Sequence, residues 1–143
     1  ITILSSDDWI DDRAKELGQT YNEAFKDWIG PATEYFIKEL DDLTCQGEFA
    51  YVAIDRTNLT KKRRKELIEK AREQNLSVGF VFFPAPHYTE HLRRLDSRPG
   101  KNIPQDVIDS MERSLQIPSI QEGFDFGYIF ENDELVDVQA TVE

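Results

Sequence analysis

The sequence predicts an α/β protein with a doubly wound, mostly parallel sheet, and three observations support this prediction. Short runs rich in branched or aromatic residues alternate along the chain with longer segments of helical periodicity. Two of these runs, 49–54 and 78–83, are apolar along their whole length, which is typical of strands buried on both faces. The runs end in polar or proline-containing turns, and strands separated by helices favour βαβ crossovers.

The first part of the chain predicts one strand and three helices, at residues 1–4, 9–17, 20–29 and from 31 onward. The polar residues 5–8 follow the strand and are good helix N-caps. Gly18 is a typical C-terminal stop. Thr20 and Glu23 have the spacing of a capping box. Pro31 is expected to begin the third helix, because proline is favoured in a first turn.

The rest of the chain predicts strands at 49–54 and 78–83, helices at 61–74, 89–95 and 104–116, and strands at 124–130 and 135–142. Thr60 is a suitable N-cap for the basic helix 61–74. A polar loop with proline and glycine follows at 96–103. We expect the last strand to pair antiparallel with the strand before it, which gives a C-terminal edge hairpin at about 124–142.

Length and composition indicate a single domain, 1–143, with 39% apolar and 31% charged residues. No apolar run approaches the ~18 residues that a membrane span needs, and no secretory leader is visible. The single cysteine, Cys45, excludes an internal disulfide and fits a reducing compartment, so we expect a cytoplasmic protein. We expect this thiol to be a half-buried helix residue rather than a nucleophile, since no histidine lies near it in sequence.

The net charge of −11 is unevenly distributed along the chain. Residues 49–103 carry 12 basic and 6 acidic groups, whereas 1–48 carry 4 and 12, and 104–143 carry 1 and 10. A basic middle between acidic flanks can concentrate a phosphate-bearing ligand. For the basic run Lys61–Lys65 by itself, the alternative is a solvated helix face.

Four polar clusters fall where a doubly wound sheet would bring them together: Ser6, Asp7 and Asp8; Asp55, Arg56, Thr57 and Asn58; His87 to His91; and Arg94 with Arg98. A carboxylate opposite arginines suits phosphoryl transfer. The carboxylate takes a proton from an attacking hydroxyl, and the arginines neutralise charge on the transferring group. The alternatives to a role in chemistry are helix capping for Asp7 and Asp8, turn formation for Thr57 and Asn58, and solvation for Arg94 and Arg98. His87 and His91 have a spacing used in zinc sites, but without a third ligand we expect no metal site.

Four stretches of the sequence carry a resemblance to a known family: LSSDDW (4–9), AIDRTNLTKKRRKELIEKAR (53–72), RRLDSRPGKNIP (93–104) and IPSIQEGFDFGYIF (117–130). Together they resemble the 5′-hydroxyl polynucleotide kinase branch of the P-loop kinases, especially the zeta-toxin-like kinases and ATPases of phages. The resemblance implies a three-layer P-loop kinase-like fold, use of ATP and Mg²⁺, and phosphoryl transfer to a hydroxyl on a nucleic-acid end or a small molecule.

The resemblance also implies roles for single residues. Asp7 resembles the general base that activates the acceptor hydroxyl. Arg94 and Arg98 resemble arginines of a lid, here at about 89–103, that hold the nucleotide phosphates. The substrate pocket would be shaped by Ser6, Asp8, Asp55, Arg56, Thr57 and Asn58.

The family begins with a strand and a G-x-x-x-x-G-K-[ST] loop whose backbone N–H groups bind phosphates, and nothing in the chain matches this loop. The Gly-Lys pair at 100–101 lies in the lid-like loop instead. We therefore expect that the first strand and the P-loop are absent from this chain, that strands 49–54 and 78–83 lack a partner between them, and that the chain alone is inactive. A further segment or a partner chain could supply the missing strand. The alternative is a non-catalytic interaction module on a degenerate P-loop kinase fold.

Overall fold

The computed structural model describes residues 1–46, 51–85 and 88–139, which form a mixed α/β structure in two compact units. The first unit consists of 1–57 together with 95–103, and the second takes up the rest. Both units contain a parallel pair of strands, so the predicted α/β class with parallel pairing is confirmed. None of the described helices has the length and apolar character that crossing a membrane requires.

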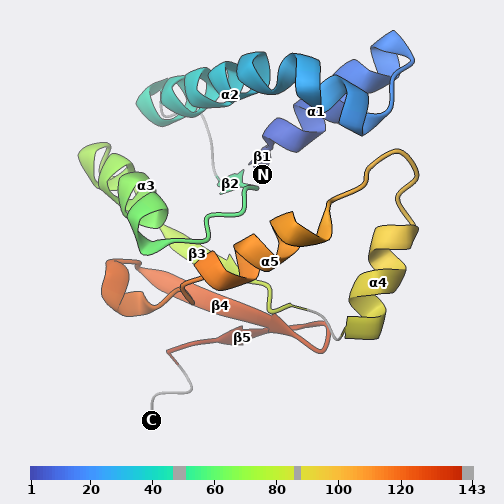
Figure 1. Ribbon diagram of the computed structural model, residues 1–143. Helices are drawn as coiled ribbons and strands as arrows, with labels where there is room; N and C mark the ends of the chain where they lie inside the picture. The colour runs from blue at the N-terminus through green and yellow to red at the C-terminus, as the bar shows by residue number, and fades with distance from the viewer. Residues whose placement is uncertain (47–50, 86–87, 140–143) are drawn as a thin grey trace. The chain divides into compact units, whose positions relative to one another are not determined.

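The first unit contains β1 (Thr2–Leu4), α1 (Ser6–Leu17), α2 (Tyr21–Gln46) and β2 (Val52–Ile54). β1 and β2 are parallel, with Thr2 opposite Val52 and Leu4 opposite Ile54. The two helices lie side by side (Figure 1), and their contact is formed by buried Ile10, Ala14, Ala24 and Ala32. Alanines at such a contact allow a short distance between the helix axes.

Helix α1 begins earlier than the sequence predicts, at Ser6 rather than at Trp9. Its N-cap is Ser5, whose Oγ accepts a hydrogen bond of 3.2 Å from the backbone N–H of Asp8. Asp7 and Asp8 therefore lie in the first turn and do not cap the helix, and their negative charges are favourable there because they face the positive end of the helix dipole. At the other end Gly18 adopts a left-handed conformation with φ 66°, as predicted.

The predicted break at Gly30 and Pro31 is wrong, because α2 continues through both residues. Pro31 lacks the N–H that would bond to the backbone carbonyl of Asp27, but it lies on the exposed side of the helix, where water can bind that carbonyl. Ala24 and Ala32 are fully buried on the two sides of the proline, so packing against α1 holds one continuous helix.

The predicted start of α2 is confirmed. Thr20 Oγ1 accepts a hydrogen bond from the Glu23 N–H, and the Glu23 carboxylate accepts one from the Thr20 N–H, at 3.3 and 3.1 Å. These reciprocal bonds form the capping box.

The second unit contains α3 (Lys61–Glu73), β3 (Gly79–Phe82), most of α4 (Tyr88–Asp96), α5 (Gln105–Ser114), a short 3-10 helix (Ile120–Glu122), β4 (Phe126–Glu131) and β5 (Glu134–Asp137). β3 and β4 are parallel, and β4 and β5 form an antiparallel hairpin, as predicted for the last two strands. The predicted ends of the strands at 49–50 and 140–142 lie outside the described residues.

Two glycines determine how β3 and β4 pair. Gly79 is opposite Phe126, and Phe80 is opposite Gly127. The ring of each phenylalanine covers the glycine of the other strand so closely that a Cβ atom on either glycine would collide with it. Each strand therefore combines a position that needs glycine with a position that supplies an aromatic ring.

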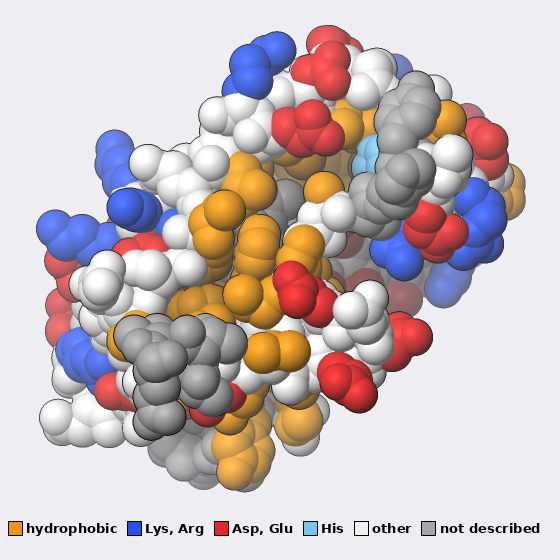
Figure 2. Space-filling model, turned by 90° about the horizontal axis from the view of Figure 1, so that it is seen from below, with side chains coloured by type: hydrophobic (Ala, Val, Ile, Leu, Met, Phe, Trp, Pro, Cys, Tyr) orange, Lys and Arg blue, Asp and Glu red, His pale blue; other side chains and the backbone are white. Residues whose placement is uncertain are grey.

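The prediction that the strand over 78–83 is buried on both faces is wrong in the described structure, because Val81 and Phe83 are 44% and 67% exposed. The register places Val81 on the same sheet face as Tyr128, and Phe130 on the same face as Leu135. Apolar side chains gather on the face of the molecule where β4 and β5 lie (Figure 2). One face of this sheet is thus apolar but accessible to solvent.

Among the described residues β2 pairs only with β1, and β3 pairs only with β4, so each of these two strands has one edge without a strand partner there. The sequence predicts an open edge for each strand, because the central strand of the resembling fold has no counterpart in the 143 residues.

A buried ion pair links α3 to the 3-10 helix within the second unit. Arg64 donates from Nε and Nη2 to the two carboxylate oxygens of Glu122, at 2.8 and 3.1 Å, and its Nη1 donates to the Asn58 carbonyl at 3.0 Å. The Arg64 and Glu122 side chains are only 5% and 9% exposed. The alternative considered for the run Lys61–Lys65, a solvated helix face, therefore does not hold for Arg64. The other four residues of the run are exposed.

Replacing Glu122 with alanine is expected to lower the free energy of unfolding by about 3–5 kcal/mol, because it leaves the Arg64 guanidinium buried without its counter-charge. Urea unfolding followed by circular dichroism measures this change. The matched control is Glu69→Ala, which removes an exposed partner of Lys65 and should cost about 0.3–0.5 kcal/mol or less. Equal costs for the two variants would contradict the structural role of the buried pair.

Candidate functional site

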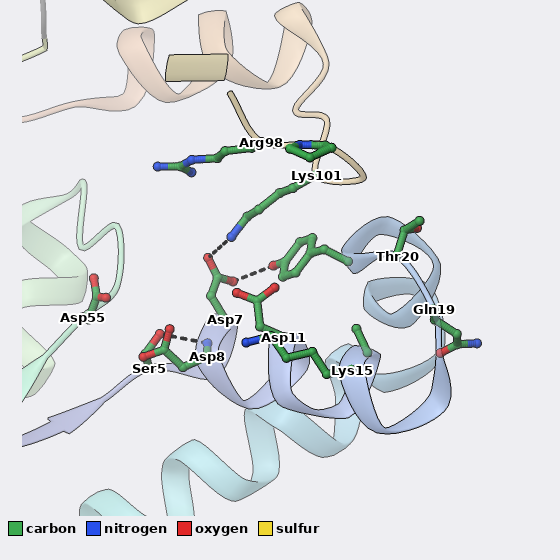
Figure 3. Close-up of a pocket in the computed structure, with 13 residues that line it drawn as sticks. Ser5, Asp7, Asp8, Asp11, Lys15, Gln19, Thr20, Asp55, Arg98 and Lys101 are labelled. Carbon is green, nitrogen blue, oxygen red and sulfur yellow. Dashed lines mark hydrogen bonds and ion pairs between the residues drawn. The ribbon is translucent and has the colours of Figure 1, made fainter. Parts of the chain in front are cut away.

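A pocket of about 610 Å³ lies within the first unit (Figure 3). Four parts of the chain line it: α1 with its N-cap, the turn between α1 and α2 together with the first residue of α2, the residue after β2, and the loop that follows α4. Its charged lining residues are Asp7, Asp8, Asp11, Lys15, Asp55, Arg98 and Lys101.

The parallel pairing of β1 with β2 explains why Asp8 and Asp55 share this pocket. Both strands end at the same edge, and the Asp55 N–H donates to the Leu4 carbonyl at 2.9 Å, directly beyond the ladder. α1 starts two residues after Leu4, so its first turn is held at the same edge. This is the edge at which open α/β sheets bind ligands.

Both oxygens of the Asp7 carboxylate have a partner. The Tyr21 hydroxyl donates to Oδ1 at 2.6 Å, and Lys101 Nζ lies 3.6 Å from Oδ2 (Figure 3). The Lys101 ammonium also lies 4.1 Å from the centroid of the Tyr21 ring, which is a cation–π contact. Asp7, Tyr21 and Lys101 therefore form one network in which each residue touches the other two.

Burial raises the pKa of the Tyr21 hydroxyl above its ordinary value, and the hydrogen bond to Asp7 and the negative charges of Asp7 and Asp11 raise it further. Tyr21 is therefore neutral at physiological pH and keeps the proton that it donates to Asp7.

Residues 1–118 match the sequence model of an AAA domain family, AAA_33. The chain belongs to this family. L-seryl-tRNA(Sec) kinase of Methanococcus maripaludis is 25% identical to the chain over 114 residues, which are 80% of this chain and 42% of the relative. The chain thus spans less than half the length of the curated relative that it matches. No solved structure matches the chain.

Membership of this AAA domain family and the kinase relative support the P-loop kinase resemblance in its general form. The family match covers three of the four stretches that carry the resemblance, with the fourth, 117–130, beginning at the end of the match.

The structure of this AAA domain protein brings together four of the predicted site residues: Asp7, Asp8, Asp55 and Arg98 all line the pocket. Three others from the first unit are absent from the lining. Ser6 is half-buried in the first turn of α1, Thr57 is exposed, and the Arg56 guanidinium lies 4.5 Å from the centroid of the Phe36 ring.

Two predicted site residues belong to the second unit, and their roles stay predictions. Asn58 has a positive φ of 42° and accepts the hydrogen bond from Arg64. Arg94 donates from Nε to Glu90 at 2.8 Å, one turn earlier in α4. The two arginines predicted to act together, Arg94 and Arg98, thus fall in different units.

The remaining sequence candidates are the two histidines and Cys45. His87 lies outside the described residues, and Nε2 of His91 is buried without a hydrogen-bond partner among them. The described residues contain no group of three or more histidine, cysteine or acidic side chains arranged to hold a metal ion. Cys45 is exposed in the last turn of α2, so the expectation of a half-buried thiol is wrong.

Sequence reasoning missed Tyr21 and Lys101, although both contact Asp7. Tyr21 reaches Asp7 across the contact between α1 and α2, which no local pattern specifies. Lys101 follows Gly100, which has a positive φ of 78°. The Gly-Lys pair in the predicted loop was the feature of the sequence that could have indicated Lys101.

The phenol of Tyr21 is expected to ionise at higher pH than a free tyrosine, whose pKa is about 10. Asp7→Asn should lower this pKa, because it removes a negative charge next to the hydroxyl, but the effect of burial should keep it above the ordinary value. A pH titration of the ¹³Cζ resonances of the tyrosines measures both values.

Asp12→Asn is the matched control for this titration. Asp12 is an exposed carboxylate of the same helix and makes no contribution to the Tyr21 pKa. An unchanged Tyr21 pKa in Asp7→Asn, or an equal shift in both variants, would show that Tyr21 and Asp7 are not coupled.

Proposed function

We propose that the protein transfers the γ-phosphoryl group of ATP to a hydroxyl group. The observation that supports this most directly is the pocket of the first unit, where the Asp7 carboxylate lies within 3.6 Å of the Lys101 ammonium, and Arg98 of the same loop shares the lining. Family membership and the kinase relative support the same reaction class.

The charge of the pocket fits a reaction between a hydroxyl and a phosphate. Four carboxylates line it, and its basic groups are Lys15, Arg98 and Lys101. The carboxylates would repel a free triphosphate, whereas the guanidinium of Arg98 and the ammonium of Lys101 would attract its oxygens. The acidic side is therefore suited to the acceptor hydroxyl, and the basic loop to the phosphate.

In this proposal Asp7 is the general base. It accepts the proton of the acceptor hydroxyl while the hydroxyl oxygen forms a bond to the γ-phosphorus, and the bond from that phosphorus to the bridging oxygen of ADP breaks. The Tyr21 hydroxyl occupies one lone pair of Oδ1 and orients the carboxylate. Arg98 neutralises part of the charge on the three oxygens of the transferring group.

The donor set of the pocket also fits Mg²⁺ delivered with the nucleotide. This ion prefers oxygen ligands and is usually held by one or two carboxylates together with substrate phosphates. Asp8 and Asp55 would hold it here, since both line the pocket and Asp7 serves as the base. When bound, the ion supplies positive charge next to the phosphate oxygens.

We include in the proposal a segment that supplies the phosphate-binding loop, because no G-x-x-x-x-G-K-[ST] motif occurs in the 143 residues. The strand edges of β2 and β3 that have no partner among the described residues are consistent with a further strand.

For the acceptor we propose a hydroxyl carried by a nucleic acid. The polynucleotide kinase resemblance favours it, and the curated relative is named a kinase of seryl-tRNA. Lys61, Lys62, Arg63 and Lys65 are exposed on the first turns of α3 and are available for nucleic-acid phosphates.

The second candidate is a non-catalytic interaction module. The observation that favours it is the exposed apolar face of the sheet in the second unit, since such faces often mark sites of protein association. Thermal unfolding with and without Mg-ATP, on the protein expressed from its intact gene, separates the candidates. Stabilisation supports the kinase, and an unchanged melting temperature contradicts it.

Asp7→Asn is expected to lower the rate of phosphoryl transfer by about 10²–10⁴-fold, because the amide accepts no proton, while the affinity for Mg-ATP stays near that of the wild type. Transfer from γ-³²P-ATP to a 5′-hydroxyl oligonucleotide, and separately to seryl-tRNA, measures the rate. The control Asp12→Asn should retain activity. A wild-type rate in Asp7→Asn would refute the assignment of the base.

A further inference from the structure

Asn22 joins the loop 97–103, which follows α4, to the start of helix α2. The Asn22 N–H donates to the Gly100 carbonyl at 3.2 Å. Its side-chain amide donates from Nδ2 to the Asn102 carbonyl at 3.2 Å and accepts at Oδ1 from the Asn102 N–H at 3.3 Å. One residue therefore holds two residues of the loop by three hydrogen bonds, across 80 positions of sequence.

The backbone N–H of Asn22 is available for this contact because of its place in the helix. It is the second residue of α2, and the first N–H groups of a helix have no partner within it. The capping box uses only the N–H groups of Thr20 and Glu23. The loop carbonyl of Gly100 thus satisfies a donor that the helix leaves free.

Gly100 lets the loop approach this helix end. Its φ is 78°, and a Cβ atom there would lie 3.1 Å from Cβ of Thr20. A side chain at this position would push the loop away from α2 and would also strain the backbone. The sequence therefore provides a glycine where the loop lies against the start of α2, and this glycine is one of the two residues that Asn22 binds.

The anchored segment carries two of the three basic groups of the pocket, Arg98 and Lys101. Lys101 stands between the two residues that Asn22 binds, and its ammonium reaches Asp7 and the Tyr21 ring. The Lys101 N–H donates to the Arg98 carbonyl at 3.2 Å, so the backbone of Arg98 is tied to the same segment. The Arg98 side chain itself is exposed.

We propose that Asn22 is a positioning residue, which fixes where Arg98 and Lys101 stand relative to Asp7. Its amide bonds to the loop backbone through both Nδ2 and Oδ1, so it acts through the loop. The inference rests on the proposed function in one respect, namely that Arg98 binds phosphate oxygens. The anchoring of the loop by Asn22 is independent of that function.

A double-mutant cycle with inorganic tripolyphosphate in the presence of Mg²⁺ tests the proposal, with affinities measured by isothermal titration calorimetry. Arg98→Ala should weaken binding about tenfold, since it removes a charge-assisted contact. Asn22→Ala should weaken it about three- to tenfold, and in the double variant the combined loss should be smaller than the product of the two single losses, because Asn22 acts partly through Arg98. Independent effects that multiply in the double variant, or wild-type affinity in Asn22→Ala, would overturn the proposal.

Glu23→Ala is the matched control, because it weakens the same helix start by removing the bond to the Thr20 N–H but makes no bond to the loop. Tripolyphosphate affinity should stay at the wild-type value in this variant. A loss equal to that of Asn22→Ala would show that fraying of α2, rather than the anchored loop, determines binding.

Hydrogen exchange at the Asn102 amide distinguishes failure of the anchor from failure of the proposed function. Exchange should accelerate in Asn22→Ala and stay slower in Asn22→Asp, which keeps an acceptor for the Asn102 N–H but loses the Nδ2 donor. If the wild type does not bind tripolyphosphate, phosphate binding by Arg98 fails, and accelerated exchange still supports the anchor. Unchanged exchange in Asn22→Ala would refute it.

Discussion

The close packing of α1 against α2 determines the geometry of the pocket. Ala14, Ala24 and Ala32 are buried at this contact and keep the distance between the helices short. Because the helices are close, the first residue of α2 can reach the first turn of α1, and the Tyr21 hydroxyl bonds to Asp7. The same helix end bonds to the loop that carries Arg98 and Lys101.

In the network of Asp7, Tyr21 and Lys101, one carboxylate is contacted by a neutral hydroxyl donor and by an ammonium group. The carboxylate is exposed enough to meet a ligand, yet its orientation is determined by two contacts that come from separate parts of the chain. Side chains held in this way lose little conformational freedom when a ligand binds, which is the usual advantage of a preorganised site.

The α/β class with parallel strand pairing, the capping box of α2 and the convergence of Asp7, Asp8 and Asp55 could be predicted from the sequence. These features depend on local periodicity, on capping residues and on the rule that parallel strands end at one edge. The place of Arg98 in the pocket depends in addition on the loop that Asn22 binds.

The features that could not be predicted depend on tertiary contacts. Pro31 is a local helix breaker, but burial of the alanines around it outweighs the single hydrogen bond that it removes. Arg64 belongs to a basic run that suggests a solvated face, and only the distant Glu122 explains its burial. Tyr21 and Lys101 join the site through a helix contact and a loop that the chain's local pattern does not specify.

The two phenylalanine–glycine pairs of β3 and β4 have a consequence for how this sheet assembles. A shift of the pairing by one residue would place Gly79 opposite Gly127, or Phe80 opposite Phe126, and would remove both ring-over-glycine contacts at once. Parallel strands that meet late in folding have no tight turn to align them. The alternation of ring and glycine therefore favours one alignment of the two strands, and a side chain at either glycine would require a smaller residue than phenylalanine opposite it.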